Sequence, residues 1–544
     1  LDVVGRVKID NYDNRSTYKA YASTGTLVSG DRGTYSDTST QSKNTYADAI
    51  ATLNKSFNDW SVNVNLGVSL SDSRYEMIGY EGGLKLINFF AVHNIDFNKA
   101  WKAKQSGWHD QTRAIFANAE IGWKSMIYLT ATGRNDWDSR LAFSDYKSFF
   151  YPSIGLSAIL TSMFNAPDWL TYLKVRGSYT EVGNSYGRFM TTVTYPYDEQ
   201  TQSWTSTSSY PNTKLKPERT KSWEVGLDAR ILNDISLNLT YYRSNTYNQT
   251  FYADLSLSSG YSNIPIQSGN IMNEGLEMSL GYNKQWKDFS FNTNYTLTWN
   301  KNRVKRLADG VYNYATGQPI QMPELSPLTY GHTDARLILR VGGSMGDVYG
   351  QRLLKRDLNG YILNEEGVGL AMENKETYLG SILPKMNMGW SLGFGYKGVN
   401  LGMTFTGRFG GIVISETQSV LDAAGVSKVS ADVRDAGGVQ INQSKVSAQT
   451  YYQTIQGTAA YYTYSATNVR LGELSLSYTL PKKWFDNKVG MTVGLVGKNL
   501  WMIYCKAPFD PEAVASTSNN YYQGMDYFMM PSLRSVGFNL KLKF

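Results

Sequence analysis

The stretch FSFNTNYTLTW at residues 289–299 alternates apolar and polar side chains along its whole length. Successive side chains of a β-strand point to opposite faces of a sheet. One face would carry Phe289, Phe291, Thr293, Tyr295, Leu297 and Trp299, and the other Ser290, Asn292, Asn294, Thr296 and Thr298. The stretch therefore predicts a long strand with one face suited to lipid and the other to water.

The same alternation recurs along the chain, in WSVNVNLGVSL (60–70), ISLNLTY (235–241), LSLSYTL (474–480) and VGFNLKLKF (536–544). A soluble β-sandwich also alternates, so strand length and strand ends must decide between the two classes. Membrane strands need about 9–11 tilted residues and prefer aromatic rings at the water interfaces. Tryptophans near the predicted strand ends favour the membrane class: Trp60, Trp223, Trp286, Trp299 and Trp484.

The predicted connections are of two kinds, as in outer-membrane barrels, which have short periplasmic turns and long outer loops. Short turns are expected at 58–59, 123–125, 233–234, 286–288, 397–399 and 486–488. Long connections are expected at about 72–108, 183–217, 303–335, 413–464 and 505–528. Loops of that length are uncommon in a compact soluble domain, so their alternation with short turns supports a barrel.

Composition excludes several other classes. No run of apolar residues is long enough for a spanning helix, which needs about 18–20. The net charge of +7 is spread over 544 residues without a basic stripe, so we expect no nucleic-acid partner. The single Cys505 and three histidines favour neither a disulfide framework nor a zinc centre. We therefore expect no cofactor, and Cys505 is interpreted as a packed thiol.

We predict an all-β fold, a transmembrane antiparallel β-barrel that forms one continuous portion over residues 1–544. About 18 strands are expected, whereas plugged outer-membrane transporters have about 22. The first residue is Leu1 rather than Met, and no signal peptide is visible. The expectation is that a plug and about four strands precede this sequence in the full protein.

Several segments resemble SusC/RagA-type TonB-dependent transporters of Bacteroidetes, and they occur in that family's order. They are LKPERTKSWEVGLDARI (215–231), SGNIMNEGLEMSLGY (268–282), YLGSILPKMNMGWSLGFGYKGVNLGMTFTGRFGG (378–411), NVRLGELSLSYTLPKKW (468–484), VGKNLW (496–501), FDPE (509–512) and PSLRSVGFNLKLKF (531–544). The resemblance covers residues 110–544 well and the first hundred only in general character.

The resemblance implies an outer-membrane importer of oligosaccharides or oligopeptides. It would be energised by TonB through an N-terminal region outside this sequence, and would work with a SusD-like surface lipoprotein. We also expect contact with outer-membrane lipid and a dimer of transporter–lipoprotein pairs. The alternatives are a passive porin, which would lack a plug and a TonB box, and a barrel adhesin or enzyme, which should show a reactive constellation at its rim.

The last strand carries Phe538, Leu540, Leu542 and Phe544 at alternate positions. This pattern resembles the C-terminal signal by which outer-membrane barrels are recognised for assembly, and it also fits a simple lipid-facing strand. Both interpretations are compatible.

Two further features suggest binding. In DLNG (357–360), Asp357 and Asn359 resemble calcium ligands, but Gly360 follows too soon, so a turn is the favoured interpretation. Aromatic pairs in the long connections could stack on sugars or contact peptides, although tyrosines are also common in girdles and loop packing. The pairs are Trp204 with Tyr210, Tyr312 with Tyr314, Tyr451 with Tyr452, Tyr461 with Tyr462, and Tyr521 with Tyr522.

No catalytic constellation is predicted. His93, His109 and His332 lie in separate segments, and neither a nucleophile elbow nor a phosphate-binding glycine loop is present. The sequence therefore does not predict an enzyme, and the substrate-contacting residues cannot be named from it.

Overall fold

The computed structural model describes residues 1–544 apart from 23–29, 100, 199–202, 206, 268, 313–315, 323, 331–332, 366–368, 487 and 515–523. The chain divides into two compact units. The first contains residues 1–157, 178–221 and 246–268, and the second contains 158–177, 222–245 and 269–544. Strands β7 (Leu170–Asn184), β10 (Glu218–Ile231) and β11 (Ile235–Tyr247) contribute residues to both.

Long antiparallel strands build the first unit, hydrogen-bonded in chain order from β1 to β7. They are β1 (Asp2–Ala20), β2 (Thr34–Phe57), β3 (Trp60–Gly83), β4 (Trp101–Trp123), β5 (Ile127–Asp138) and β6 (Phe149–Ile159). Strands β2 and β3 have 24 residues each and β4 has 23, about twice what a membrane crossing requires. The apolar face of β3 stops near Leu70, and the strands continue beyond it with polar side chains.

This extension corrects the predicted connection at 72–108, because β3 and β4 occupy most of that range. Polar cross-strand contacts hold the extended hairpin together. Nε2 of His109 lies 2.7 Å from Asp72 Oδ2, and Nζ of Lys104 lies 2.5 Å from Glu81 Oε2. Only residues 84–100 connect the two strands.

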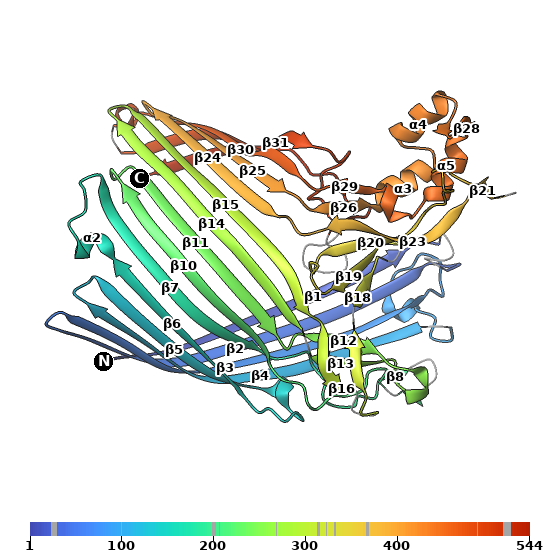
Figure 1. The fold of residues 1–544 in the computed structure, drawn as a ribbon, viewed down its shortest axis with the longest axis horizontal. Coiled ribbons are helices and arrows are strands. Elements are labelled where there is room, and N and C mark those ends of the chain that lie inside the picture. Colours follow the sequence, from blue (N-terminus) through green and yellow to red (C-terminus); the bar gives the residue numbers. More distant parts are fainter. Residues whose placement is uncertain are drawn as a thin grey trace. The chain divides into compact units, whose positions relative to one another are not determined.

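In the second unit the main strands are hydrogen-bonded in the order β7, β10, β11, β14, β15, β24, β25, β30, β31, β33. Its further strands are β14 (Asn270–Trp286), β15 (Phe289–Arg306), β24 (Met386–Tyr396), β25 (Val399–Phe409), β30 (Asn468–Thr479), β31 (Gly490–Cys505) and β33 (Ser535–Lys543). Strands β14, β15, β24 and β25 run side by side in Figure 1. Among the described residues the main sheet has 16 strands, close to the roughly 18 expected, and further strands of the long connections form small sheets of their own.

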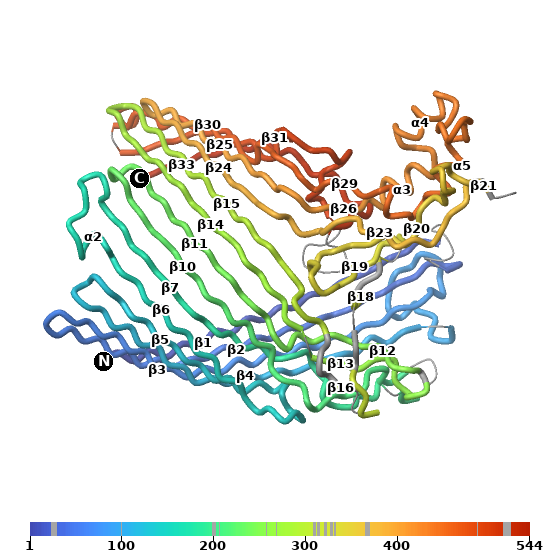
Figure 2. The backbone as a smooth tube through the Cα atoms, in the orientation of Figure 1, coloured from blue at the N-terminus to red at the C-terminus, as the bar shows by residue number. Residues whose placement is uncertain are grey.

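Tight turns join these strands at one end, and long connections join them at the other. In Figure 2 the turns of the second unit after β14 and β24 lie at the same end of the strands. Turn residues Asn58, Lys287 and Lys397 have φ of 50°, 47° and 45°, the left-handed values of two-residue hairpins. Five of the six predicted turns are confirmed, and the sixth contains residue 487, outside the described residues.

The two faces of the sheet differ in chemistry. On one face, aromatic rings of neighbouring strands touch: Phe291 lies 5.0 Å from Phe394, and Trp390 lies 5.8 Å from Phe405, between ring centroids. The opposite face is polar, and its side chains pack closely across neighbouring strands. A Cβ atom added at Gly393 would lie only 2.5 Å from Nδ2 of Asn292. The period-two pattern in residues 289–299 is confirmed by this division.

Fully buried apolar clusters of the described residues lie mainly in the connections rather than along the strands. One contains Tyr35, Leu84 and Ile95, and another contains Leu141, Phe149, Tyr186 and Leu215. Large apolar side chains in the sheet are instead exposed, such as Leu280 at 41 % and Leu495 at 56 %. Among the described residues, no helix is long and apolar enough to cross a membrane.

Short elements complete the connections. The paired strands are β8 (Tyr197–Asp198) with β9 (Ser203–Trp204), β12 (Thr250–Asp254) with β13 (Asn263–Gln267), β16 (Ala308–Tyr312) with β17 (Pro319–Met322), β21 (Asn364–Glu365) with β22 (Gly369–Leu370), and β27 (Val439–Ile441) with β28 (Ser444–Val446). The short helices are η1 (Val92–Asn94), η2 (Ser139–Leu141), α2 (Leu160–Met163), η3 (Leu257–Ser259) and η5 (Lys482–Phe485).

Candidate functional site

The connection between β15 and β24 folds into a four-stranded sheet. Its strands are β18 (Glu324–Thr329), β19 (Arg336–Arg340), β20 (Asp347–Leu354) and β23 (Met372–Ser381). Backbone bonds of 2.8 Å from Val304 N to Gly343 O, and from Gly342 N to Val304 O, attach it to β15. The side chain of Asn302 adds a third attachment by accepting a bond from Met345 N at 2.8 Å. This long connection is thus a folded layer fixed to the end of a main strand.

The next long connection, residues 410–467, is also folded and contains helices that the sequence analysis did not predict. They are α3 (Glu416–Ala423), α4 (Lys428–Asp435), α5 (Ala448–Ile455) and the short η4 (Ala459–Tyr461). Figure 1 shows α3 beside β26 (Ile412–Ser415) and β29 (Thr463–Ser465). Ser415, Ser427 and Ser447 cap α3, α4 and α5 by accepting backbone N–H bonds. Those serines are the sequence signal that could have located the helices.

A buried cluster joins these two connections. It contains Leu354, Leu370, Ile441, Tyr452, Ile455 and Tyr462. Tyr461 contributes a directional contact, because its hydroxyl accepts a bond from Leu354 N at 3.0 Å. Tyr452 and Tyr462 are therefore core residues of this layer rather than exposed stacking platforms.

Asp334 links the same two connections through its carboxylate. Oδ2 accepts bonds from Gln351 N at 3.0 Å and Arg352 N at 2.7 Å, while Oδ1 accepts one from Ala459 N at 2.7 Å. Hydrogen bonds to a charged acceptor are stronger than neutral ones. A single side chain thus fixes β20 against the segment that follows α5.

We predict that Asp334→Ala loosens this layer without unfolding the main sheet, because three backbone N–H groups lose their acceptor. The expected cost is about 2–3 kcal/mol of local opening free energy. Hydrogen exchange of residues 351–352 and 457–461 would measure it. Asp432→Ala, which removes an exposed pair with Lys428 on α4, is the matched control and should leave those amides unchanged. Equal protection in the two variants would contradict the role of Asp334.

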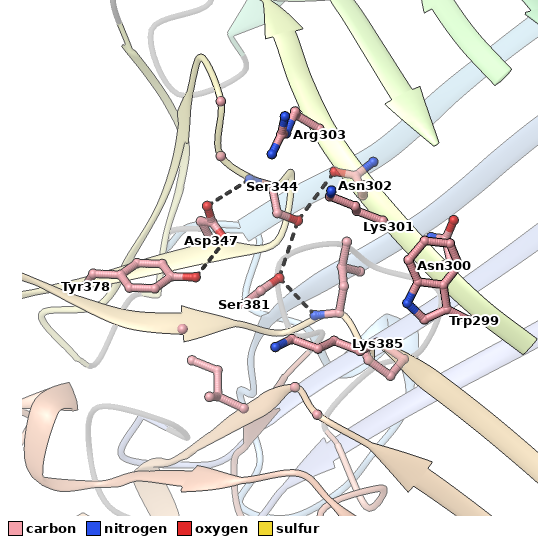
Figure 3. Close-up of a pocket in the computed structure, with 18 residues that line it drawn as sticks. Trp299, Asn300, Lys301, Asn302, Arg303, Ser344, Asp347, Tyr378, Ser381 and Lys385 are labelled. Atoms are coloured by element: carbon pink, nitrogen blue, oxygen red, sulfur yellow. Dashed lines mark hydrogen bonds between the residues drawn. The ribbon is translucent and has the colours of Figure 1, made fainter. Parts of the chain in front are cut away.

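A cavity of about 690 Å³, lined by both polar and apolar residues, lies where the four-stranded layer meets β15 (Figure 3). Ser344 N donates to Asp347 Oδ2 at 2.8 Å, and the Tyr378 hydroxyl donates to Oδ1 at 3.2 Å. Burial raises the pKa of Asp347 above its ordinary value, and these two bonds oppose that shift only in part. Both carboxylate oxygens of Asp347, the acidic residue of the cavity lining, are therefore engaged in hydrogen bonds within the protein.

Three cationic side chains also line the cavity: Lys301, Arg303 and Lys385. Nζ of Lys301 lies 3.8 Å from Glu274 Oε1. In the part of the chain that the structure describes, no carboxylate lies within 4.0 Å of the charged groups of Arg303 or Lys385. Figure 3 shows these two side chains bordering the cavity from opposite sides. The cavity therefore offers positive charge that the protein itself does not neutralise.

A buried ion pair closes the connection after β31. Arg470 of β30 donates to both carboxylate oxygens of Asp510 at 2.8 and 2.9 Å, and Asp510 also accepts a bond from Ser532 Oγ at 2.6 Å. The FDPE segment (509–512) is thus tied to one main strand and to the residues before another. The sequence marked this segment but could not indicate its partner.

The other predicted site residues are dispersed. DLNG forms a turn in which Asp357 Oδ1 accepts bonds from Asn359 N at 2.9 Å and Tyr361 N at 2.8 Å. Among the described residues, no group of three or more His, Cys, Asp or Glu side chains could hold a metal ion. Trp204 is 70 % exposed and stacks edge-on against Tyr197. Tyr314, His332, Tyr521 and Tyr522 lie outside the described residues.

Comparison with known proteins identifies the class. An antiparallel sheet with one exposed apolar face and one polar face is the architecture of outer-membrane barrels. Residues 4–500 match the family described as TonB dependent receptor-like, beta-barrel, so the chain belongs to that family of bacterial outer-membrane proteins. The predicted fold class and outer-membrane location are confirmed.

The chain is also similar to individual proteins of known class. The chain is 24 % identical over 544 residues to TonB-dependent receptor P3 of Formosa agariphila, covering 92 % of this chain and 52 % of that protein. It is 25 % identical over 243 residues to TonB-dependent receptor SusC of Bacteroides thetaiotaomicron, covering 44 % of this chain and 22 % of that protein. These relatives are receptors rather than enzymes. The chain spans about half the length of the curated relatives it matches most fully.

Solved structures give the same fold. The structure described as the RagAB peptide transporter superposes with a TM-score of 0.79 at 19 % identity, covering 99 % of this chain and 60 % of that chain. The RagAB peptide importer in its "open-open" state gives 0.77, also at 19 % identity, over 100 % and 59 %. The resemblance to SusC/RagA-type proteins is confirmed.

Proposed function

We propose that this chain is the barrel of an active importer of oligosaccharides or oligopeptides, energised by TonB and acting with a SusD-like surface lipoprotein. The observation that carries the proposal is the family match over residues 4–500. In a barrel of this class the long connections lie on the outer side of the membrane. The plug and TonB-binding segment would belong to the remainder of the full-length protein, and two transporter–lipoprotein pairs would form the dimer.

The folded layers at the outer end support this role. A passive pore needs only an open entrance, whereas the described residues of 307–385 and 410–467 form a packed layer with its own buried cluster and the Asp334 link. Such a layer offers a defined surface for a lipoprotein and for a large substrate. Neither the cavity nor the exposed aromatic residues select between sugars and peptides, so both substrate classes remain in the proposal.

Uptake of labelled oligomers by cells with and without the full-length protein tests the proposal. Deletion should abolish uptake of one oligomer class that exceeds the porin size limit, while entry of small sugars and amino acids stays unchanged. If deletion slows only small solutes, the chain is a passive porin and the proposal fails.

We also propose that Phe538, Leu540, Leu542 and Phe544 act together as an assembly signal. The four side chains are all exposed, from 44 % at Leu542 to 92 % at Phe544. Phe538, Leu540 and Leu542 of β33 pair with Leu495, Val493 and Met491 of β31, respectively. Deleting Phe544 should lower the outer-membrane yield several-fold, measured as the heat-modifiable folded band on gels. Replacing Lys541, on the other face of β33, by Ala is the control. Unchanged yield after the deletion would reject the signal.

A further inference from the structure

We propose that a cavity between α3, α4 and α5 binds the amino terminus of an oligopeptide, with the peptide's ammonium group at Asp422. The inference rests on the proposed function, because it names peptides as the imported class and this cavity as a point of contact. It is carried by a buried carboxylate that no cation of the protein neutralises, by the polarity of two helix ends, and by an unpartnered tyrosine hydroxyl.

The helical cavity, as we call it, has a volume of about 480 Å³. The three helices around it contact one another, and Figure 1 shows them together. The lining comes from residues 422–425 at the end of α3, from Ser430 and Arg434 of α4, and from residues 447–449, 452 and 453 of α5 and its cap. A volume of this order is typical of sites for small ligands, so the cavity can hold the end of a peptide.

Asp422 is the acidic residue of this lining, and it is only 5 % exposed. Its Oδ1 accepts a bond from Nε2 of Gln418 at 2.7 Å and another from the Ser427 hydroxyl. Oδ2 accepts no hydrogen bond from any described residue and is not enclosed by them, so it is open to the cavity. One oxygen of a buried carboxylate is therefore available to a ligand.

The charge of Asp422 is not neutralised within the described residues, since no nitrogen of Lys, Arg or His lies within 4.0 Å of it. Arg434 lines the same cavity, but it is 62 % exposed and lies 3.7 Å from Asp435 instead. Burying a carboxylate without a charged partner is costly. A cation supplied by a ligand would remove that cost.

The two helix ends at the cavity have opposite polarity. Asp422 is the last residue but one of α3, and the C-terminal end of a helix carries the negative end of its dipole. Ser447 and Gln449 stand at the start of α5, where the first N–H groups have no partner within the helix. An ammonium group suits the first end and a carbonyl oxygen suits the second. The first residue of a peptide carries both groups, whereas a neutral sugar offers no cation to Asp422.

Tyr452 adds a hydroxyl group near Asp422. The residue is 7 % exposed, and its ring belongs to the buried cluster of this layer. Its hydroxyl has no hydrogen-bond partner among the described residues. Burial and the nearby Asp422 carboxylate raise the pKa of Tyr452, so the hydroxyl stays protonated at neutral pH. Its oxygen can accept a second bond from the ammonium group.

The test uses the full-length protein purified in detergent and isothermal titration calorimetry. The probes are oligoalanine with a free amino terminus, the same peptide N-acetylated, and an oligomer of glucosamine, whose ammonium groups belong to a sugar. The unmodified protein should bind the free peptide at least about 30-fold more tightly than the acetylated one, because acetylation removes the charge that pairs with Asp422.

Two variants assign the effect to this cavity. Asp422→Asn keeps an oxygen for Gln418 and Ser427 but loses the charge, so it should bind the free and the acetylated peptide alike. Tyr452→Phe should weaken binding of the free peptide by about fivefold. Asp432→Asn, on the exposed surface of α4, is the matched control and should bind like the unmodified protein. Heat-modifiability on gels confirms that each variant is assembled before it is titrated.

Four results would overturn the inference: no binding of the free peptide to the unmodified protein, equal binding of the acetylated peptide, unchanged binding in Asp422→Asn, or equally tight binding of the glucosamine oligomer. TonB-dependent uptake of oligomers together with any of these would leave the proposed function standing. Loss of that uptake with the preference for a free amino terminus intact would instead contradict the proposed function.

Discussion

Replacing Arg470 by Met is expected to cost about 3–5 kcal/mol of unfolding free energy, because it leaves the buried carboxylate of Asp510 without its partner. The two side chains are only 10 % and 9 % exposed. Arg470 also donates to Asn468 Oδ1 at 3.0 Å and lies 3.3 Å from Glu512 Oε2. Its loss would release the FDPE segment from β30 and disturb the pairing of the strands on either side of that connection.

Urea titration of the detergent-solubilised full-length protein would measure this cost, with hydrogen exchange of residues 509–512 reporting the local release. Lys428→Met is the control, because its pair with Asp432 is exposed at 85 % and 63 % and should contribute little. The double variant with Asp510→Asn should cost less than the sum of the single changes. A loss below about 1 kcal/mol in Arg470→Met would contradict the role of this pair.

The same pair should also make the outer end sensitive to acid. Burial alone would raise the pKa of Asp510, but bonds from Arg470 and Ser532 outweigh it, and the pKa lies below its ordinary value. Since the folded pKa is lower than the unfolded one, the stabilisation is complete above the unfolded pKa. It is lost as the pH falls through the folded pKa. Exchange protection of residues 509–512 should therefore fall at acidic pH in the unmodified protein and change less in Arg470→Met.

Placing an arginine at Leu280 is the second change with a large expected effect. Leu280 lies midway along β14, opposite Tyr295, on the exposed apolar face. An arginine on the lipid face near the bilayer midplane costs about 2–4 kcal/mol in outer-membrane barrels. Leu280→Arg should therefore lower both the folded yield and the unfolding free energy.

Ser279→Arg is the matched control, because it adds the same side chain one residue away. Ser279 lies on the polar face, where its hydroxyl donates to Asn294 at 3.0 Å. That face can accommodate a charge, so the control should assemble near the normal level in a gel-shift assay of folded barrel. If the two variants assemble equally well, the assignment of the lipid and polar faces is wrong.

The strands were predictable from the sequence because apolar and polar residues alternate within each of them. The pattern in residues 289–299 indicated both the strand and its faces, and the tight turns were readable from short Asn, Asp and Gly segments. The length of β3 and β4 was not predictable. Their outer halves are rich in polar residues, and from composition alone such a segment cannot be distinguished from a loop. The register shows where they end: Gly83 pairs with Thr34 of β2, and Trp101 pairs with Gly82 of β3.

The outer layers were less predictable, and for a different reason. Each of α3, α4 and α5 has eight residues, too few to show a helical period clearly. Their stability comes from packing around Tyr452 and Ile455 rather than from local preference. The roles of Asp334 and Arg470 depend on neighbours distant in sequence. Single residues of this kind leave no local pattern, so the sequence indicated none of them.

Oligomer uptake with and without energy coupling tests most directly the proposed role of the full-length protein as an active importer. Labelled oligosaccharides and oligopeptides would be supplied to matched cells that contain or lack TonB, with the full-length protein present at equal levels in the outer membrane. If the proposal is right, cells with TonB accumulate one oligomer class, and cells lacking TonB bind it at the surface without importing it. Entry at the same rate in both strains would contradict the account and identify a passive pore.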